Sequence, residues 1–246
     1  MKFGLIGYPL THSFSKSYFE EKFHSLGLVG FTYSNFSLGN IENIFSILHS
    51  DVFGLNVTIP YKSAVIYYLN DIDQTALKIG AVNTLVRTGL NSWKGFNTDV
   101  SGFRLSLQDY MKNSPIPERA IILGTGGAAK AVKFSLESIG IKSSFVSRES
   151  GSDYKYEDLT KDVIDSHLLI INATPVGTFP KADECPLIPY HLLTRNHWLF
   201  DLVYNPTNTL FLTRGAEMGA HTKNGLDMLH LQAEQAWIIW KSYGKF

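Results

Sequence analysis

The sequence predicts an α/β fold divided between two domains, each with helices covering a sheet. Strand-like apolar segments and helix-like segments alternate along all 246 residues. A glycine-rich turn stands between a strand and a helix near residue 124, in the middle of the chain. Because such a turn normally opens its own domain, the ~120 residues before it predict a separate domain. The polar, proline-containing stretch 112–117 has the composition of a connection between domains.

The elements follow one another in a regular order. In the first half, strands are predicted at 3–7, 31–36, 53–57 and 81–86, and helices at 15–26 and 41–48. In the second half, helices are predicted at 100–111 and 128–139, strands at 119–123, 143–146, 168–172 and 198–202, and a last amphipathic helix after Gly225. This alternation indicates parallel sheets covered by helices.

Composition excludes several classes of protein. Lysine plus arginine and aspartate plus glutamate number 22 each, and no basic run stands out. Nucleic acid and membrane are therefore not expected as partners. The apolar start is too short for a signal peptide, and no apolar stretch is long enough to span a membrane. The single Cys185, without metal-ligand spacing, fits a reducing compartment, so we expect a cytoplasmic protein without a metal.

The glycine-rich turn predicts dinucleotide binding. Gly124 permits a tight turn, Gly126 lets the backbone approach a pyrophosphate, and Ala129 lets the following helix pack on the strand. The helix that follows would direct its unpaired N–H groups at the phosphates.

The choice between NAD and NADP depends on the residues ~20 positions beyond the first glycine. An acid there would accept from the ribose 2′-hydroxyl, but this chain has Ser147 and Arg148. The guanidinium of Arg148 suits a 2′-phosphate, which favours NADP. Glu149 counts against this, because it could pair with Arg148 or repel the phosphate.

Polar side chains gather in four segments of the first half, each at or after a predicted strand. They are His12-Ser13-Phe14-Ser15, Asn56-Val57-Thr58 with Pro60 and Lys62, Ala81-Val82-Asn83-Thr84, and Gly95-Phe96-Asn97-Thr98-Asp99. Taken singly, the serines and Asp99 could only cap helices, Asn83 could be a turn residue and Lys62 a solvated lysine. Since the carboxyl ends of parallel strands form the ligand crevice of α/β sheets, we expect these side chains to form one polar pocket.

These segments and their order resemble the shikimate dehydrogenase family. The resemblance extends through Asn172-Ala-Thr-Pro-Val-Gly177, Asp201-Leu-Val-Tyr204 and Gly225-Leu-Asp-Met-Leu-His-Leu-Gln232, and so covers nearly the whole chain. It implies an N-terminal α/β substrate domain, a Rossmann-type NADP-binding domain, and an active site in the cleft between them. The last helix would rejoin the first domain, giving a substrate domain of residues 1–99 plus 225–246 and a cofactor domain of residues 100–224.

The resemblance also implies the reaction and the residues that perform it. The reaction is the reversible, NADPH-dependent reduction of 3-dehydroshikimate to shikimate, a step of chorismate and aromatic amino acid biosynthesis. Lys62 and Asp99 would be the catalytic pair, and His12 would only shape its loop. The substrate would be bound by Ser13, Ser15, Thr58, Lys62, Asn83, Asp99, Tyr204 and Gln232. The cofactor would be bound by Gly124, Gly126, Gly127, Ala128, Ser147, Arg148, Asn172, Thr174 and Gly225.

Three alternatives stay open at this point. An NAD-using quinate/shikimate dehydrogenase shares the fold, although Ser147 and Arg148 do not favour it. A tetrahydrofolate dehydrogenase–cyclohydrolase would not need the Ser13/Ser15 pair or Asp99. A sensor that binds NADP or a shikimate-like ligand without turnover would not need both Lys62 and Asp99. Either a monomer or a homodimer is compatible with the sequence.

Overall fold

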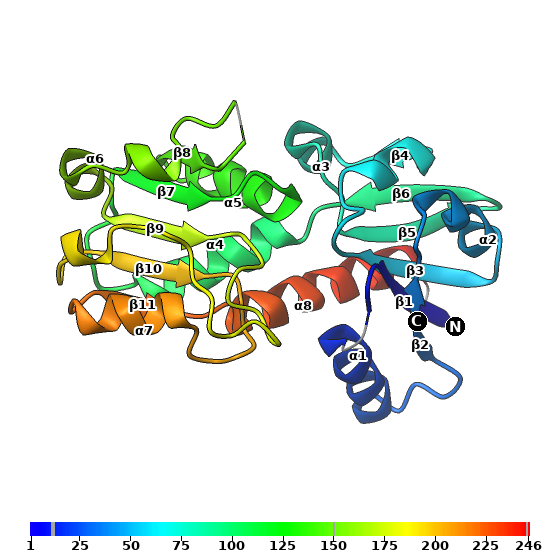
Figure 1. Ribbon diagram of the computed structural model, residues 1–246. Coiled ribbons are helices and arrows are strands. Elements are labelled where there is room, and N and C mark those ends of the chain that lie inside the picture. Colours follow the sequence, from blue (N-terminus) through cyan, green and yellow to red (C-terminus); the bar gives the residue numbers. More distant parts are fainter. Residues whose placement is uncertain (11–12, 150, 245) are drawn as a thin grey trace. The chain divides into compact units, whose positions relative to one another are not determined.

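The computed structural model describes residues 1–10, 13–149, 151–244 and 246, and the chain divides into two compact units (Figure 1). The first unit consists of Met1–Thr98 and Ala233–Phe246, and the second of Asp99–Gln232. The first boundary lies within one residue of the position expected from the sequence. The second lies inside the last helix rather than before it, so one helix contributes residues to both units.

The first unit is built on a six-stranded mixed sheet with the strand order β2-β1-β3-β5-β6-β4. The strands are β1 (Lys2–Gly7), β2 (Thr32–Ser37), β3 (Val52–Val57), β4 (Asp71–Ile72), β5 (Thr84–Gly89) and β6 (Ser92–Phe96). Strand β1 runs parallel to β2 and β3, whereas β5 runs antiparallel to both β3 and β6. The prediction of an all-parallel sheet was therefore wrong for this unit. The reason is a two-residue hairpin between β5 and β6, in which Asn91 takes a positive φ of 55°.

The sequence prediction missed four elements of this unit, namely α3 (Gln74–Ile79), the 3-10 turn η2 (Ala64–Tyr68), β4 and β6. The other helices are α1 (Phe14–Ser25) and α2 (Ile44–Leu48), with a further 3-10 turn η1 (Ile41–Asn43). The expected helix 41–48 is thus a 3-10 turn followed by a short α-helix. The predicted strand 81–86 begins only at Thr84, so Asn83 stands just before it.

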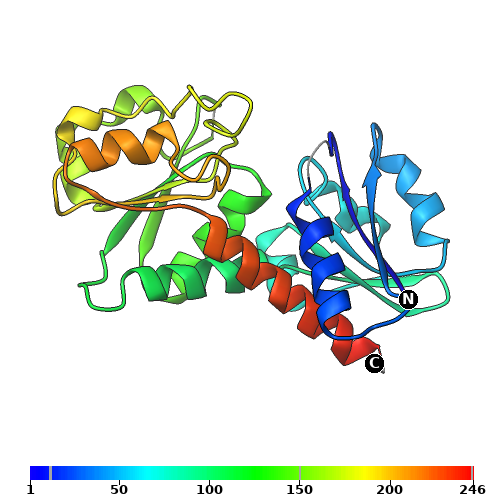
Figure 2. The same ribbon diagram turned by 90° about the horizontal axis from the view of Figure 1, so that it is seen from below.

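An aromatic cluster joins the end of the chain to its beginning. Helix α8 (Leu226–Tyr243) places the Trp240 ring 4.8 Å from Phe3 and 5.0 Å from Phe19, measured between ring centroids. The Trp240 indole donates to the Leu85 carbonyl at 2.9 Å. Glu234 of α8 accepts from the Lys22 ammonium of α1 at 2.6 Å. Figure 2 shows the end of α8 beside α1. The last helix therefore completes the core of the first unit.

The second unit is built on a five-stranded sheet with the order β11-β10-β9-β7-β8, and every pair in it is parallel. The strands are β7 (Arg119–Leu123), β8 (Lys142–Val146), β9 (Leu169–Asn172), β10 (Trp198–Asp201) and β11 (His221–Lys223). The helices are α4 (Asp99–Tyr110), α5 (Gly127–Ser138), α6 (Lys161–Ser166) and α7 (Leu210–Glu217), with 3-10 turns η3 (Tyr156–Asp158) and η4 (Tyr190–Leu192). This confirms the parallel, helix-covered sheet that the sequence predicts for this part of the chain.

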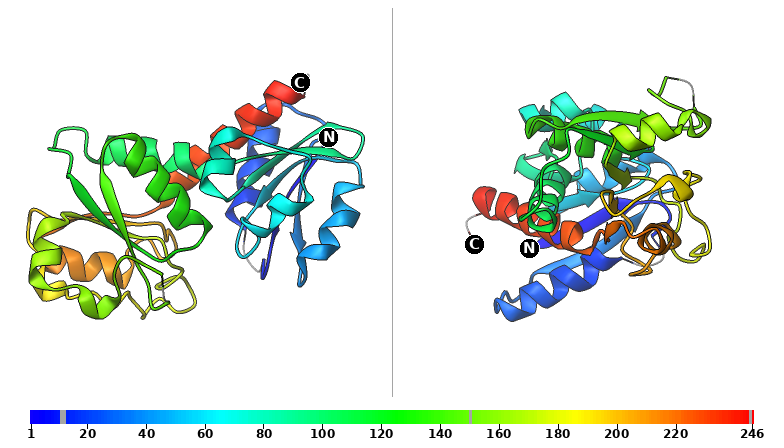
Figure 3. Two further views of the ribbon diagram at one scale, coloured as in Figure 1. Left: turned by 90° about the horizontal axis from the view of Figure 1, so that it is seen from above. Right: turned by 90° about the vertical axis from the view of Figure 1, so that its left-hand side faces the viewer.

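Alternate residues of β7 pack on opposite faces of this sheet. Ile122 lies in a core with Phe103 of α4, Leu136 of α5 and Met228 of α8. Ile121 lies in a second core formed with α6 and α7. Strands buried on both faces are continuously apolar, which is why 119–123 is readily predicted from sequence. Figure 3 shows helices on both sides of the sheet.

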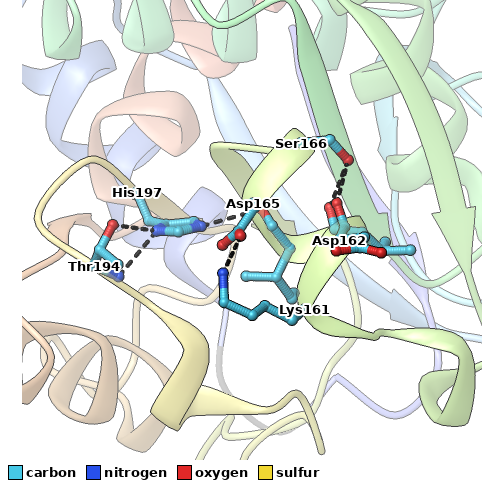
Figure 4. A network of polar contacts seen from close by, with 8 residues as sticks. Lys161, Asp162, Asp165, Ser166, Thr194 and His197 are labelled. Carbon is cyan, nitrogen blue, oxygen red and sulfur yellow. Dashed lines mark hydrogen bonds and ion pairs between the residues drawn. The ribbon is translucent and has the colours of Figure 1, made fainter.

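One buried histidine of the second unit has a structural explanation. His197 is 1% exposed, and its Nδ1 accepts from the Thr194 backbone N–H at 3.0 Å. The proton must therefore be on Nε2, which donates to the Ile164 carbonyl of α6 at 3.2 Å. Figure 4 shows this ring between the two segments, with the ion pair Lys161–Asp165 on the same helix. Through these two bonds His197, which directly precedes β10, connects α6 to the segment before that strand.

Candidate active site

Three of the four polar segments of the first half lie at one edge of the first sheet. Thr58 follows the end of β3 and Asn97 the end of β6. Asn83 stands just before β5, which runs in the opposite direction, so its beginning lies beside the ends of its neighbours. The register confirms this, because Thr84 pairs with Asn56 on one side and with Phe96 on the other. Asn83 therefore reaches the expected edge although its strand runs antiparallel.

Asn83 is the centre of a buried set of hydrogen bonds. Its Oδ1 accepts from the Thr98 backbone N–H at 2.8 Å, and its Nδ2 donates to the Thr98 hydroxyl at 3.0 Å. Only 3% of Asn83 and 2% of Thr98 is exposed. Asp99 follows Thr98 directly and is the first residue of α4. The interpretation of Asn83 as a simple turn residue does not account for this network.

Lys62 is held in a tight connection after β3. The Tyr61 N–H donates to the Thr58 carbonyl at 3.0 Å, and the Lys62 carbonyl accepts from the Val82 N–H at 2.7 Å. The second bond ties the backbone of Lys62 to the residue before Asn83. The side chain is half-buried rather than fully solvated.

Ser13 and Ser15 stand at the start of α1. Ser13 caps the helix, since its Oγ accepts from the Lys16 N–H at 3.2 Å. That bond uses an oxygen lone pair, and a hydroxyl can accept one bond and donate another. Burial raises the pKa of the Tyr33 phenol well above its usual value, and the neighbouring Ser15 side chain lowers it somewhat. His12 lies outside the described residues.

Tyr204 and Gln232 belong to the second unit together with Asp99. Tyr204 follows β10 and is half-buried, and this burial raises the pKa of its phenol. Gln232 lies on α8, where its Nε2 donates to the Leu229 carbonyl at 2.8 Å. A Cβ on Gly102 would lie 2.9 Å from the Gln232 Cβ, so that glycine lets α4 and α8 approach closely.

The glycine-rich turn has the geometry that its sequence predicts. Gly124 has a φ of +100°, and its N–H donates to the Val146 carbonyl at 2.8 Å. Gly126 is the N-cap of α5, and a Cβ there would meet no atom within 4 Å. Ala129 is fully buried against the sheet. The first N–H groups of α5, at Gly127 and Ala128, have no partner within the helix and are suited to phosphate oxygens.

A pocket of about 780 Å³ opens beside this turn. Four of the predicted cofactor residues line it, namely Gly124, Ser147, Arg148 and Thr174. Sequence reasoning missed other lining residues, because they come from connections and a helix without a recognisable motif. These are Tyr156, Lys181, Asp183, Glu184, Cys185, Leu187 and Arg214 among others. Cys185, for which the sequence indicates no metal-ligand role, is thus part of a pocket wall.

Arg148 is exposed at the end of β8. The Glu149 N–H donates to the Ser147 hydroxyl at 3.1 Å, which closes the turn after the strand. Across the described residues, no ion pair joins Arg148 to Glu149. The guanidinium is therefore not neutralised by its acidic neighbour, which removes one of the two objections to phosphate binding.

Asn172 lies behind the pocket rather than in its wall. Its Oδ1 accepts from the Thr174 hydroxyl at 2.6 Å, and its Nδ2 donates to Asp201 at 2.9 Å. Asp201 is fully buried and also accepts from the Thr209 hydroxyl at 2.6 Å and from the Val203 N–H at 3.0 Å. Burial raises the pKa of Asp201 to about 6, against the opposing effect of these hydrogen bonds. Asn172 therefore shapes the pocket by holding Thr174.

Gly225 is not one of the residues that line the pocket. Its role is to let two backbone segments pack closely. A Cβ at Gly225 would lie 2.2 Å from the Leu202 carbonyl oxygen, so the two backbones touch there. Its N–H donates to the Val203 carbonyl at 3.1 Å. Only glycine permits this contact.

The described residues contain neither a metal-binding cluster nor a membrane-spanning helix. Across residues 1–10, 13–149, 151–244 and 246, no group of three histidine, cysteine, aspartate or glutamate side chains could hold a metal ion. Over the same residues, no helix has the length and apolar character needed to cross a membrane.

Comparison with known proteins identifies the family. A model described as the shikimate dehydrogenase substrate binding domain matches residues 5–85. A protein named shikimate dehydrogenase (NADP(+)) from Desulforamulus reducens is 33% identical over 264 residues, which cover 98% of this chain and 89% of that protein. The chain belongs to the shikimate dehydrogenase family. Its predicted two-domain α/β class, with a Rossmann-type domain, is confirmed.

Solved structures agree with this family and show its range of ligands. A shikimate dehydrogenase from Thermus thermophilus, in complex with NADP(H) and shikimate, matches with a TM-score of 0.83 and 29% identity, covering 98% of this chain and 94% of that one. A quinate dehydrogenase from Corynebacterium glutamicum, in complex with NAD, matches with a TM-score of 0.84 and 27% identity, covering all of this chain and 94% of that one. The fold alone therefore does not distinguish shikimate from quinate.

The name of the relative from Desulforamulus reducens includes the cofactor NADP(+), and the residues of the second unit are suited to bind it. The open space beside Gly126 can take a pyrophosphate, and Arg148 at the end of β8 can take a 2′-phosphate. The acid that would mark an NAD site is replaced by Ser147.

Proposed function

We propose that the protein is an NADP-dependent shikimate dehydrogenase, which reversibly reduces the ketone of 3-dehydroshikimate to the hydroxyl of shikimate. The buried Asn83–Thr98 network beside Lys62 carries this proposal, because it presents hydrogen-bonding groups at the edge of a unit that matches a substrate binding domain. A small ligand with several hydroxyls needs such groups, since an unpaired buried polar group costs ~1–3 kcal/mol.

Two functional domains divide the work in this proposal, and their bounds differ from those of the compact units at Asp99 and at residues 225–232. Residues 1–99 with 225–246 form the substrate domain, and residues 100–224 form the cofactor domain. The open glycine turn and the pocket near Arg148 support the second assignment. The match of a substrate-domain model to residues 5–85 supports the first.

Lys62 and Asp99 are the catalytic pair. Bound NADPH supplies the hydride, and reduction leaves negative charge on the ketone oxygen. An ammonium within ~3 Å can donate the proton that this oxygen needs. A carboxylate beside the lysine favours its charged form and orients it, and the pair takes the proton back in the reverse reaction.

The remaining polar residues select the substrate. Ser13, Ser15 and Tyr204 bind its carboxylate with hydroxyl donors. Thr58, Asn83 and Gln232 bind the ring hydroxyls and the ketone, together with Asp99. The cap bond at Ser13 supports this role, because it fixes the hydroxyl oxygen at the start of α1.

The cofactor is bound along one side of the second sheet. The proposed residues are Gly124, Gly126, Gly127, Ala128, Ser147, Arg148, Asn172, Thr174 and Gly225. Four of them line the pocket, while Asn172 and Gly225 act through Thr174 and the 202–203 backbone. The balanced charge and single Cys185 support a cytoplasmic location. Monomer and homodimer both fit the proposal, and sedimentation of the purified chain distinguishes them.

The test is the absorbance of reduced nicotinamide with purified protein and four pairs of reactants. Shikimate and quinate are each offered with NADP⁺ and with NAD⁺. Fast reduction with shikimate and NADP⁺ alone is the expected result. Comparable rates with NAD⁺ or quinate would place the protein with the quinate/shikimate dehydrogenases. Absence of reduction with all four pairs, from folded protein, would favour a ligand sensor and contradict the proposal.

A further inference from the structure

We propose that Tyr33, Asn56 and Thr84 form a hydrogen-bond relay that positions Asn83, turning its amide so that the N–H₂ end serves as the donor to the substrate. The relay lies within the first unit and joins β2, β3 and β5. This inference rests on the proposed function of Asn83 as a substrate-binding residue.

The first step is the orientation of Asn56. Its side chain faces the Asn83 backbone carbonyl at 3.4 Å and the Thr84 hydroxyl at 3.3 Å. A carbonyl can only accept, so the atom of Asn56 that faces it must be the amide nitrogen. The oxygen Oδ1 is therefore on the other side, 2.8 Å from the Tyr33 hydroxyl. Because Oδ1 can only accept, Tyr33 must donate.

The second step extends the same donor-to-acceptor order from Asn56 through Thr84 to Asn83. Thr84 accepts from Asn56, so its own hydroxyl proton goes to an oxygen, and Asn83 Oδ1 at 3.1 Å is nearer than the Thr98 hydroxyl at 3.3 Å. Asn83 Oδ1 is independently identified as the acceptor, because the Thr98 backbone N–H points at it from 2.8 Å. Donors therefore follow one direction from Tyr33 through Asn56 and Thr84 to Asn83. The amino group of Asn83, which donates one hydrogen to the Thr98 hydroxyl at 3.0 Å, lies at the opposite end of its amide.

Burial makes this arrangement hard to reverse. The exposed fractions of Tyr33, Asn56 and Thr84 are 2%, 5% and 0%. The Tyr33 ring also stacks on Phe19 of α1, with centroids 4.9 Å apart and planes 12° apart. Water cannot replace a missing partner at such depth, and an amide flip at Asn83 would set its N–H₂ against the Thr98 N–H. The relay thus specifies which end of Asn83 meets the ligand.

The start of the relay lies at the other end of the proposed substrate site. The Ser15 side chain lies near the Tyr33 phenol, whose own proton goes to Asn56. Ser15, assigned to the substrate carboxylate, and Asn83, assigned to its hydroxyls, therefore lie near opposite ends of the relay. No surface motif in the sequence indicates that arrangement.

The test compares two substitutions at Thr84 that remove opposite features. Thr84→Val keeps the shape and removes the hydroxyl, whereas Thr84→Ser keeps the hydroxyl and removes the methyl group. Tyr33→Phe interrupts the relay at its far end, and Tyr61→Phe is the matched control, because its hydroxyl bonds to the Leu38 backbone carbonyl instead. Shikimate KM, NADP⁺ KM, kcat and thermal stability are measured for each.

We expect Thr84→Val and Tyr33→Phe to raise the KM for shikimate about tenfold, the effect of one misdirected hydrogen bond, with the KM for NADP⁺ unchanged. Thr84→Ser and Tyr61→Phe should retain the wild-type KM for shikimate. The relay is refuted if Thr84→Val has the wild-type KM for shikimate. It is also refuted if Thr84→Ser and Thr84→Val raise this KM equally and in proportion to their loss of thermal stability. Wild-type protein that does not oxidise shikimate at all would contradict the proposed function instead, so the two failures are distinct.

Discussion

Asp201→Asn offers a direct test of how burial of one carboxylate affects the second unit. Asp201 is fully buried, and this burial raises its pKa to about 6 from an ordinary value of 3.8. Because the folded pKa lies above the unfolded one, the fold favours the protonated form. The resulting stabilisation is complete below about pH 4 and is lost as the pH rises through 6. The shift corresponds to about 3 kcal/mol in the free energy of unfolding.

The asparagine variant is neutral at every pH and lacks this dependence. Its mismatch with the donors Thr209, Asn172 and Val203 adds a constant destabilisation, independent of pH. The stability of the variant relative to wild type should therefore improve by about 3 kcal/mol between about pH 4 and pH 7.

The assay is urea unfolding followed by tryptophan fluorescence over that pH range. Asp109→Asn, at an exposed position of α4, serves as the control for the same chemical change at the surface. A difference between Asp201→Asn and wild type that does not vary with pH would refute the reasoning. It would mean that the three hydrogen bonds to Asp201 balance its desolvation and leave its pKa unshifted.

Four other variants test separate parts of the description. Lys62→Ala should lower turnover by ~10²-fold or more with NADP⁺ affinity little changed, while Lys78→Ala, on the exposed end of α3, should be normal; an intact kcat in the first variant would contradict the catalytic assignment. Arg148→Ala should raise the KM for NADP⁺ about tenfold and leave that for NAD⁺ unchanged, and equal effects on both would exclude 2′-phosphate recognition. Gly225→Ala should lower stability by ~1–3 kcal/mol through the Leu202 clash, and a variant as stable as wild type in thermal unfolding would count against that contact. Trp240→Ala should cost ~3–5 kcal/mol in the first unit, as measured by denaturant unfolding, and a smaller loss would mean that the aromatic cluster closes over the gap.

The parts predicted best from sequence are those whose physical signal is local. Strand β7 occupies the expected residues because an apolar run buried on both faces has no polar alternation to confuse it. The φ of +100° at Gly124 was likewise predictable, since only glycine adopts it readily. The motif at Asn83 indicated the correct edge of the sheet, although its strand was predicted to run the wrong way.

The parts that were missed depend on contacts distant in sequence. The β5–β6 hairpin escaped detection because Ser92–Phe96 is short and contains Gly95, and the direction of β5 followed from that omission. Lys181 and Arg214 reach the pocket from separate segments, and no spacing rule connects them with Gly124. The relay through Tyr33 required three strands to be placed in register before any of its bonds existed.

The division of α8 between the two units sets an order for the newly synthesised chain. Every residue of the second unit has been joined to the growing polypeptide before Ala233, so that unit can acquire its complete set of contacts first. Phe3 and Phe19 are made well before Trp240, which packs against both of them. During that interval these apolar side chains lack their final covering. We therefore expect nascent chains stalled before residue 233 to show a protease-resistant second unit and a protease-sensitive first unit, and to be the species most dependent on chaperones.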